Sequence, residues 1–147
     1  MIMYDKKDYD KSNKITSVKL SKFKSDNYLS VLNAKNSSER YEASVKLLDY
    51  LCDKFKIERI SFSLLDKPRK CNSRSQIYGF YVVGRNQIKI YNKTAKTLKM
   101  IAPKTYMETL LHEFIHHYDM KVIKLTTSLH TGGFYKRITD LNDKLKN

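Results

Sequence analysis

The segment from Pro103 to about Ile123 is the feature that most constrains how this chain can fold. Its apolar residues recur at the three- and four-residue spacings of one helix face, and Pro103 with the pattern Thr105-x-x-Glu108 predicts a capped N-terminus. The apolar residues are Leu110, Leu111, Phe114, Ile115 and Tyr118. Such a helix buries its apolar face against other elements, so the rest of the chain must supply a core around it.

Shorter patterns predict the other elements of an α+β fold. Residues 39–55 have apolar side chains at helical spacing, which predicts an N-terminal helix of the domain, and Ser37 or Ser38 is expected to cap its start. Residues 57–65 alternate apolar and polar side chains, as a half-buried strand does. Residues 76–83 and 87–91 flank a Gly-Arg-Asn turn, which predicts a hairpin and hence a short antiparallel β-sheet. Residues 134–145 are amphipathic and predict a C-terminal helix.

The domain organisation follows from composition. Residues 1–36 are polar and mixed in charge, and we expect an N-terminal extension to which no function is assigned. Residues 37–147 are long enough for one globular domain. The charged N-terminus gives no signal peptide, and no segment approaches the ~20 apolar residues of a membrane span. We therefore expect a cytoplasmic protein without a membrane partner, and its cysteines, Cys52 and Cys71, are too few for a four-cysteine zinc module.

Two histidines and a glutamate stand together in the predicted helix. His112 and His116 are four residues apart and so lie one turn apart on the same side, where both imidazoles can reach one tetrahedral zinc ion. Glu113 lies beside the first histidine, where its carboxylate can accept a proton from a zinc-bound water as that water attacks a carbonyl group. The pattern His-Glu-x-x-His therefore predicts a zinc-dependent peptidase with Glu113 as the catalytic base.

A catalytic zinc site needs a third protein ligand and keeps one position open for water. No glutamate follows Glu113, which excludes a ligand of the thermolysin type, and Asp119 stands where metzincins have glycine. His130 is the preferred candidate, because imidazole is a common zinc ligand and the glycines that follow can form a turn back towards the helix. Asp119 and Asp140 remain alternatives. We expect His117 to point away from the metal, either to solvent or to a place behind the ligands.

These residues resemble the SprT-like (Spartan) family of zinc metallopeptidases. The resemblance is carried by the segment 110–116, by His130, and by Phe134 four residues later. It implies a small zincin-like metallopeptidase domain over residues 37–147, acting on a protein or peptide substrate that includes proteins bound or crosslinked to DNA. The implied site residues are His112, His116 and His130 as ligands of Zn²⁺ and Glu113 as the base.

The net charge gives a separate prediction about partners. The chain carries 29 Lys and Arg against 15 Asp and Glu, and between residues 53 and 104 the counts are thirteen and three. A surface this basic attracts polyanions, so we expect contact with DNA through a basic loop between Pro68 and Ser75. The candidate nucleic-acid-binding residues are Lys67, Arg69, Lys70 and Arg74.

Two other functions remain open from the sequence. The chain could be a basic nucleic-acid-binding protein whose zinc is structural, which requires a fourth protein ligand. It could also be a peptidase dedicated to one protein partner, such as a transcriptional repressor, with no requirement for DNA. Whether or not a peptidase requires DNA, the predicted hairpin of residues 76–91 is the candidate for pairing with the extended backbone of its substrate.

Overall fold

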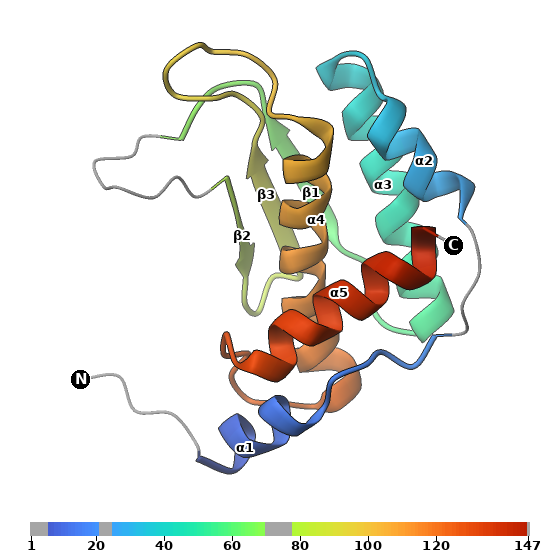
Figure 1. Cartoon of the computed structure of the whole chain (residues 1–147), viewed down its shortest axis with the longest axis vertical. Helices are drawn as coiled ribbons and strands as arrows, with labels where there is room; N and C mark the ends of the chain where they lie inside the picture. Colours follow the sequence, from blue (N-terminus) through green and yellow to red (C-terminus); the bar gives the residue numbers. More distant parts are fainter. Residues whose placement is uncertain (1–5, 21–24, 70–77, 147) are drawn as a thin grey trace.

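The computed structural model describes residues 6–20, 25–69 and 78–146, which form an α+β fold of five α-helices and a small mixed sheet (Figure 1). The elements are α1 Lys6–Lys14, α2 Asp26–Asn33, α3 Ser37–Phe55, β1 Ser61–Leu65, β2 Gly79–Val82, β3 Gln87–Tyr91, α4 Pro103–Tyr118, the π-helical turn η1 Asp119–Ile123, and α5 Gly132–Lys146. The predicted α+β class is confirmed. None of the helices in these ranges has the length and apolar character that crossing a bilayer requires.

The sheet has the strand order β1-β3-β2. β2 and β3 form the predicted antiparallel hairpin, with Gly79 opposite Ile90. In its turn, Gly84 and Asn86 adopt positive φ angles of 84° and 48°, which these two residue types tolerate best. β1, however, is parallel to β3. The predicted antiparallel sheet is therefore wrong for this pair, because alternating polarity specifies the two faces of a strand and not the direction of its neighbour.

Helices on one side of the sheet hold the central helix α4 in place. α3 and α4 contact the strands, and α2 and α5 contact α4 in turn (Figure 1). Fully buried side chains from these layers include Leu47, Leu51, Ile88, Ile90, Leu110 and Phe114. Burying one side chain of this size contributes roughly 1.5–3 kcal/mol, so the orientation of α4 is strongly determined by its apolar face.

The segment before Ser37 packs against the rest of the chain. α2 contacts α3 and α4, and α1 contacts α5. Val18, Tyr28 and Val31 belong to the hydrophobic core, and Ser12 is fully buried. Residues 6–20 and 25–36 of the expected extension thus share the core of the residues that follow them.

The starts of two helices differ from the predictions. Asn36, not a serine, caps α3: its side-chain oxygen accepts a hydrogen bond from the backbone N–H of Glu39 at 2.8 Å. α4 begins at Pro103 without a side-chain cap, so the predicted capping role of Thr105 is wrong. Proline determines this start because its fixed φ suits the first helical position and its missing N–H would have no partner there.

Candidate metal centre

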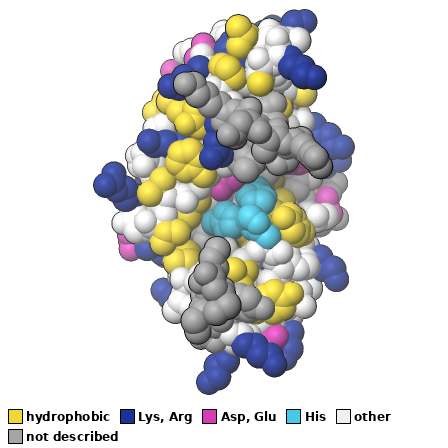
Figure 2. Space-filling view, turned by 90° about the vertical axis from the view of Figure 1, so that its left-hand side faces the viewer, with side chains coloured by type: hydrophobic (Ala, Val, Ile, Leu, Met, Phe, Trp, Pro, Cys, Tyr) yellow, Lys and Arg dark blue, Asp and Glu magenta, His cyan; other side chains and the backbone are white. Residues whose placement is uncertain are grey.

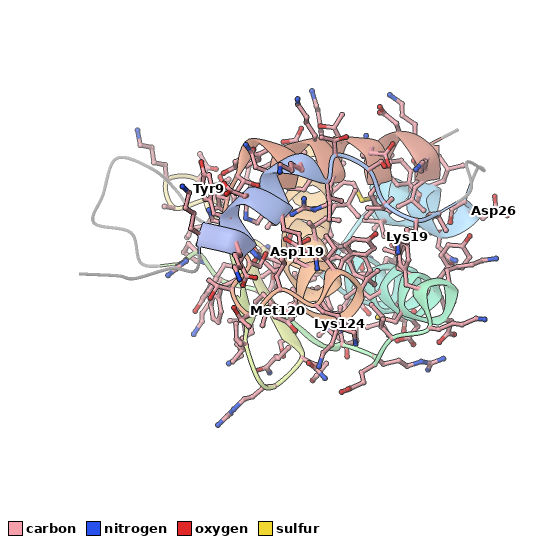
Figure 3. The ribbon with its side chains drawn as sticks, turned by 90° about the horizontal axis from the view of Figure 1, so that it is seen from below. Tyr9, Lys19, Asp26, Asp119, Met120 and Lys124 are labelled. Carbon is pink, nitrogen blue, oxygen red and sulfur yellow. The ribbon has the colours of Figure 1, made fainter. Side chains whose placement is uncertain are left out.

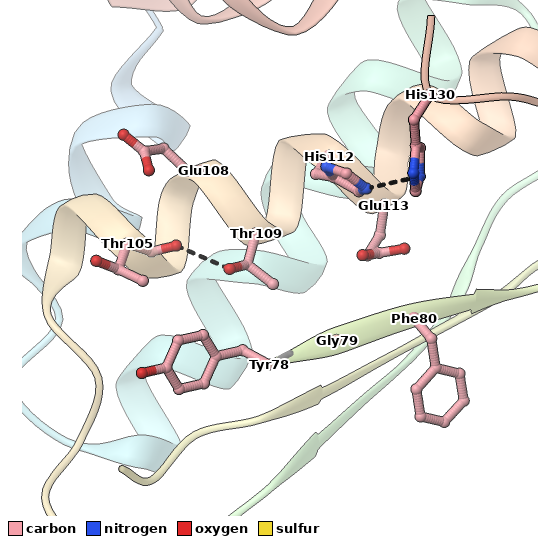
Figure 4. Close-up of a pocket in the computed structure, with 9 residues that line it drawn as sticks. All are labelled: Tyr78, Gly79, Phe80, Thr105, Glu108, Thr109, His112, Glu113 and His130. Carbon is pink, nitrogen blue, oxygen red and sulfur yellow. Dashed lines mark hydrogen bonds between the residues drawn. The ribbon is translucent and has the colours of Figure 1, made fainter. Parts of the chain in front are cut away.

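Three histidine side chains, those of His112, His116 and His130, meet beside the C-terminal half of α4, and Figure 4 shows His112 next to His130. His130 Nε2 lies 3.3 Å from His112 Nε2 and 3.1 Å from His116 Nε2. One ring nitrogen from each residue lies within 4.8 Å of the other two. Donor atoms bound to one tetrahedral zinc at about 2.0–2.1 Å are roughly 3.3 Å apart, so the spacing and the chemistry of this donor set fit such an ion. The three imidazoles could therefore hold a metal.

Burial keeps two of these imidazoles neutral. Desolvation lowers the pKa of His112 to about 4, and the neighbouring His130 adds to the effect. Desolvation also lowers the pKa of His116 to about 3, with smaller contributions from the two other histidines and Arg137. Neutral imidazole is the form that binds metal ions, so both side chains have a lone pair available at neutral pH.

A chain of hydrogen bonds orients His116. Ser128 Oγ donates a hydrogen bond to Asp119 Oδ2 at 2.7 Å, and Ser128 Oγ in turn accepts one from His116 Nδ1 at 2.8 Å. Asp119 is held by Arg137, whose Nε and Nη2 lie 3.0 and 2.8 Å from its two carboxylate oxygens. With Nδ1 as the donor, Nε2 of His116 carries the lone pair that faces the other two histidines. Asp119 therefore supports a candidate ligand and does not belong to the ligand group.

His117 and Asp140 also lie outside this group. His117 is fully buried, where its Nε2 donates to the backbone oxygen of Glu58 at 2.7 Å and its Nδ1 accepts from the Tyr81 hydroxyl at 2.8 Å. His117 points away from the three histidines, as predicted. The expectation that it lies in solvent or behind the ligands is wrong, because it is buried and its hydrogen bonds connect α4 to β2 and to Glu58 before β1. Asp140 forms an ion pair with Lys144 on α5.

Phe134 closes one side of the histidine group. Its ring centroid lies 5.0, 4.7 and 5.1 Å from the centroids of His112, His116 and His130, and its side chain is fully buried. The opposite side is open, because His130 is exposed and the histidines form a visible patch at the centre of one face (Figure 2). A ligand can therefore approach the three histidines from solvent on this open side.

A groove of about 440 Å³ runs between α4 and β2 past the histidines. Its walls include Tyr78, Gly79 and Phe80 on the strand side and Thr109, His112 and Glu113 on the helix side (Figure 4). The side chain of Glu113 projects into this groove, although the residue is only 6% exposed. Desolvation raises the pKa of Glu113 to about 7, although the positive charge of Arg69 acts to lower it. A carboxyl group with this pKa can both accept and donate a proton near neutral pH.

The four candidate DNA contacts do not form one described patch. Lys67 is exposed after β1. The guanidinium carbon of Arg69 lies 5.6 Å from the ring centroid of Phe80, at the groove. Lys70 and Arg74 lie outside the described residues. In Figure 2, the Lys and Arg side chains of the described residues are spread around the face that carries the histidines. DNA contact stays a prediction from charge.

The roles of Ser128 and Arg137 were not predicted from the sequence. A signal for Arg137 exists, since it lies three residues after Phe134 and four before Leu141, on the apolar stripe of α5. A charged residue at such a position requires a buried partner. Ser128 has no comparable pattern, because a serine in a polar turn is ordinary.

Comparison with known proteins identifies no relative: no protein-family model, curated protein or solved structure matches the chain. The features that bear on function are therefore the three histidines, Glu113 and the groove beside them.

Proposed function

We propose that this protein is a zinc-dependent peptidase in which His112, His116 and His130 hold the zinc and Glu113 is the catalytic base. The observation that carries the proposal is the buried carboxyl group of Glu113 in the same groove as His112 and His130. Three imidazole ligands leave one tetrahedral position free, as a catalytic site requires. The resemblance of the motif residues to SprT-like peptidases supports the same assignment.

Glu113 would move the proton during hydrolysis. A zinc ion held by the three imidazoles would act as a Lewis acid towards water and towards a peptide carbonyl group. Glu113 accepts one proton of the water as the water oxygen bonds to the carbonyl carbon. The same carboxyl group then delivers that proton to the amide nitrogen as the C–N bond breaks, which yields a carboxylic acid and an amine.

The edge strand β2 supports an extended protein segment as the substrate. In the order β1-β3-β2, no other strand of the described residues pairs with the outer edge of β2. An extended peptide can add to such an edge through main-chain hydrogen bonds, which would align a peptide bond with the groove that contains Glu113. Recognition of this kind depends more on the backbone of the substrate than on its side chains. The substrate would include proteins on DNA if the basic surface binds DNA.

The number of ligands argues against a purely structural zinc. Such a site would need four protein ligands. Across residues 6–20, 25–69 and 78–146, the His, Cys, Asp and Glu side chains form one group with metal-binding spacing, and its members are the three histidines. A peptidase for a single partner protein would use the same three ligands and base, and differs only in what enters the groove.

The test is Glu113→Gln, with the exposed Glu42→Gln as a matched control. Because Glu113 is outside the ligand group, zinc content should be unchanged in both variants. Hydrolysis of a fluorescently labelled unfolded protein should fall at least roughly 100-fold in Glu113→Gln, since a general base contributes about that much or more, and should persist in the control. Equal hydrolysis by the parent and by Glu113→Gln would contradict the assignment of Glu113 as the catalytic base of a peptidase.

A further inference from the structure

The loop between η1 and α5 carries the third histidine and is joined to helix α1. Asp8 Oδ2 accepts hydrogen bonds from the backbone N–H of Thr126 at 2.8 Å, from the Thr126 hydroxyl, and from the N–H of Thr127 at 3.3 Å. Lys11 Nζ donates to the backbone oxygen of Ile123 at 2.9 Å, where the loop begins. One face of α1 thus satisfies polar groups along the first part of this loop.

The end of α1 continues these contacts into the centre of the molecule. Ser12 Oγ lies 2.9 Å from Thr131 Oγ1, next to the third histidine. Arg137, which holds Asp119, also donates Nη2 to Ser12 Oγ at 3.0 Å and Nη1 to two carbonyl groups at the end of α1, each at 2.6 Å. Figure 3 shows α1 crossing beside Asp119. One guanidinium group therefore connects α1 with the carboxylate that orients His116 through Ser128.

The backbones of α1 and α5 approach so closely that glycine is required between them. A Cβ atom at Gly133 would lie 2.2 Å from Ser12 O and 2.7 Å from Asn13 O, and both are backbone atoms that cannot easily move. A Cβ atom at the neighbouring Gly132 would meet only Asn13 Oδ1, at 3.2 Å, which is the end of a movable side chain. Gly133 therefore permits α1 to dock, while Gly132 has no such role.

From these contacts we infer that helix α1 is a positioning element of the metal centre, which holds the His130 loop through Asp8 and supports His116 through Arg137. The inference rests on the metal site of the proposed function and does not require peptide hydrolysis. Docking of α1 and metal binding then favour each other, and the coupling is reciprocal: α1 raises the affinity for the metal by the same factor by which the metal raises the affinity of α1 for its docking surface.

Two matched pairs of variants test the inference through zinc affinity, measured by competition with a chromophoric chelator. Asp8→Ala removes the contacts to the loop, whereas Asp10→Ala removes the same charge from an exposed position of the same helix. Gly133→Ala blocks docking and Gly132→Ala does not. Losing the support of a metal ligand lowers affinity roughly 10- to 100-fold, so the zinc Kd should rise by about that factor in Asp8→Ala and Gly133→Ala and stay within about twofold in the controls.

Amide hydrogen exchange of residues 6–14 gives an independent readout, because added zinc should slow exchange in α1 of the parent and not in Asp8→Ala. A merely structural role for α1 would lower the melting temperature of Asp8→Ala and leave its zinc Kd equal to that of Asp10→Ala, which overturns the inference. The Asp8 pair decides the matter if Gly133→Ala does not fold. A parent protein that binds no zinc overturns the inference and the proposed function together, whereas zinc binding without hydrolysis overturns the peptidase alone.

Discussion

Replacing Glu113 by Gln should stabilise the metal-free protein even though it removes the proposed catalytic base. Burial raises the pKa of Glu113 from 4.5 to about 7. Between these values the folded protein keeps a proton that the unfolded chain releases. The stability contributed by this group is therefore fully present below about pH 4.5 and is lost as the pH rises towards and through 7. Gln cannot ionise and so avoids this loss.

The size of the effect follows from the pKa values. A rise in pKa from 4.5 to about 7 corresponds to about 3 kcal/mol once the pH exceeds 7, and to about 1 kcal/mol at pH 5, which lies only slightly above the pKa of the unfolded carboxyl group. Since the residue is only 6% exposed, solvent screening reduces these figures little. At pH 8 the melting temperature of Glu113→Gln should exceed that of the parent by roughly 10 °C.

Urea unfolding at pH 5 and pH 8 measures this difference. The samples contain a chelator, because a cation beside Glu113 would lower its pKa. Other titrating groups, including the histidines, are common to both proteins and cancel when the two free energies of unfolding are subtracted. Glu42→Gln reports the effect of the same substitution at an exposed position. A gain that is equal at the two pH values, or a loss at pH 8, would refute the buried, protonated state of Glu113.

Two further predictions concern the ligands and DNA. His130→Ala should lower zinc affinity strongly. His117→Ala should lower only the free energy of unfolding, because His117 forms hydrogen bonds with Tyr81 and Glu58 and lies outside the group of three histidines. Equilibrium dialysis with zinc compares the two variants, and a greater loss of zinc in His117→Ala would contradict the proposed ligands. Charge reversal of the four candidate DNA contacts should weaken DNA binding in a fluorescence anisotropy titration and make its salt dependence less steep, since fewer counterions are released. If the parent does not bind DNA at low ionic strength, a peptidase with a single protein partner is favoured.

The two candidate ligands on α4 could be predicted because helix periodicity alone relates them. A spacing of four residues determines that His112 and His116 share a side of any α-helix, whatever surrounds it. His130 could be ranked only by its chemistry, and its contact with the other two depends on the path of a loop. The sequence does not specify that path, because its backbone is held by groups elsewhere in the chain.

The sheet has a similar limit. Alternation of polarity correctly indicated which segments are extended and where the hairpin turns, since both depend on neighbouring residues. The direction of β1 depends instead on which strand it meets after the chain has passed through β2 and back along β3. Nothing in the alternation of residues 61–65 differs between a parallel and an antiparallel partner.

The N-terminal segment gave the weakest sequence signal of all, and the contacts of α1 explain why. α1 meets the loop mainly through hydrogen bonds, including those between Asp8 and Thr126, which lie 118 positions apart. Polar residues at such a separation form no periodic pattern, so α1 resembles a solvated extension. Each of its hydrogen bonds contributes only about 1 kcal/mol, but several act together on the loop that carries His130. The most recognisable motif in the chain therefore supplies two of the three candidate ligands, while the place of the third depends on residues that only the folded structure brings beside it.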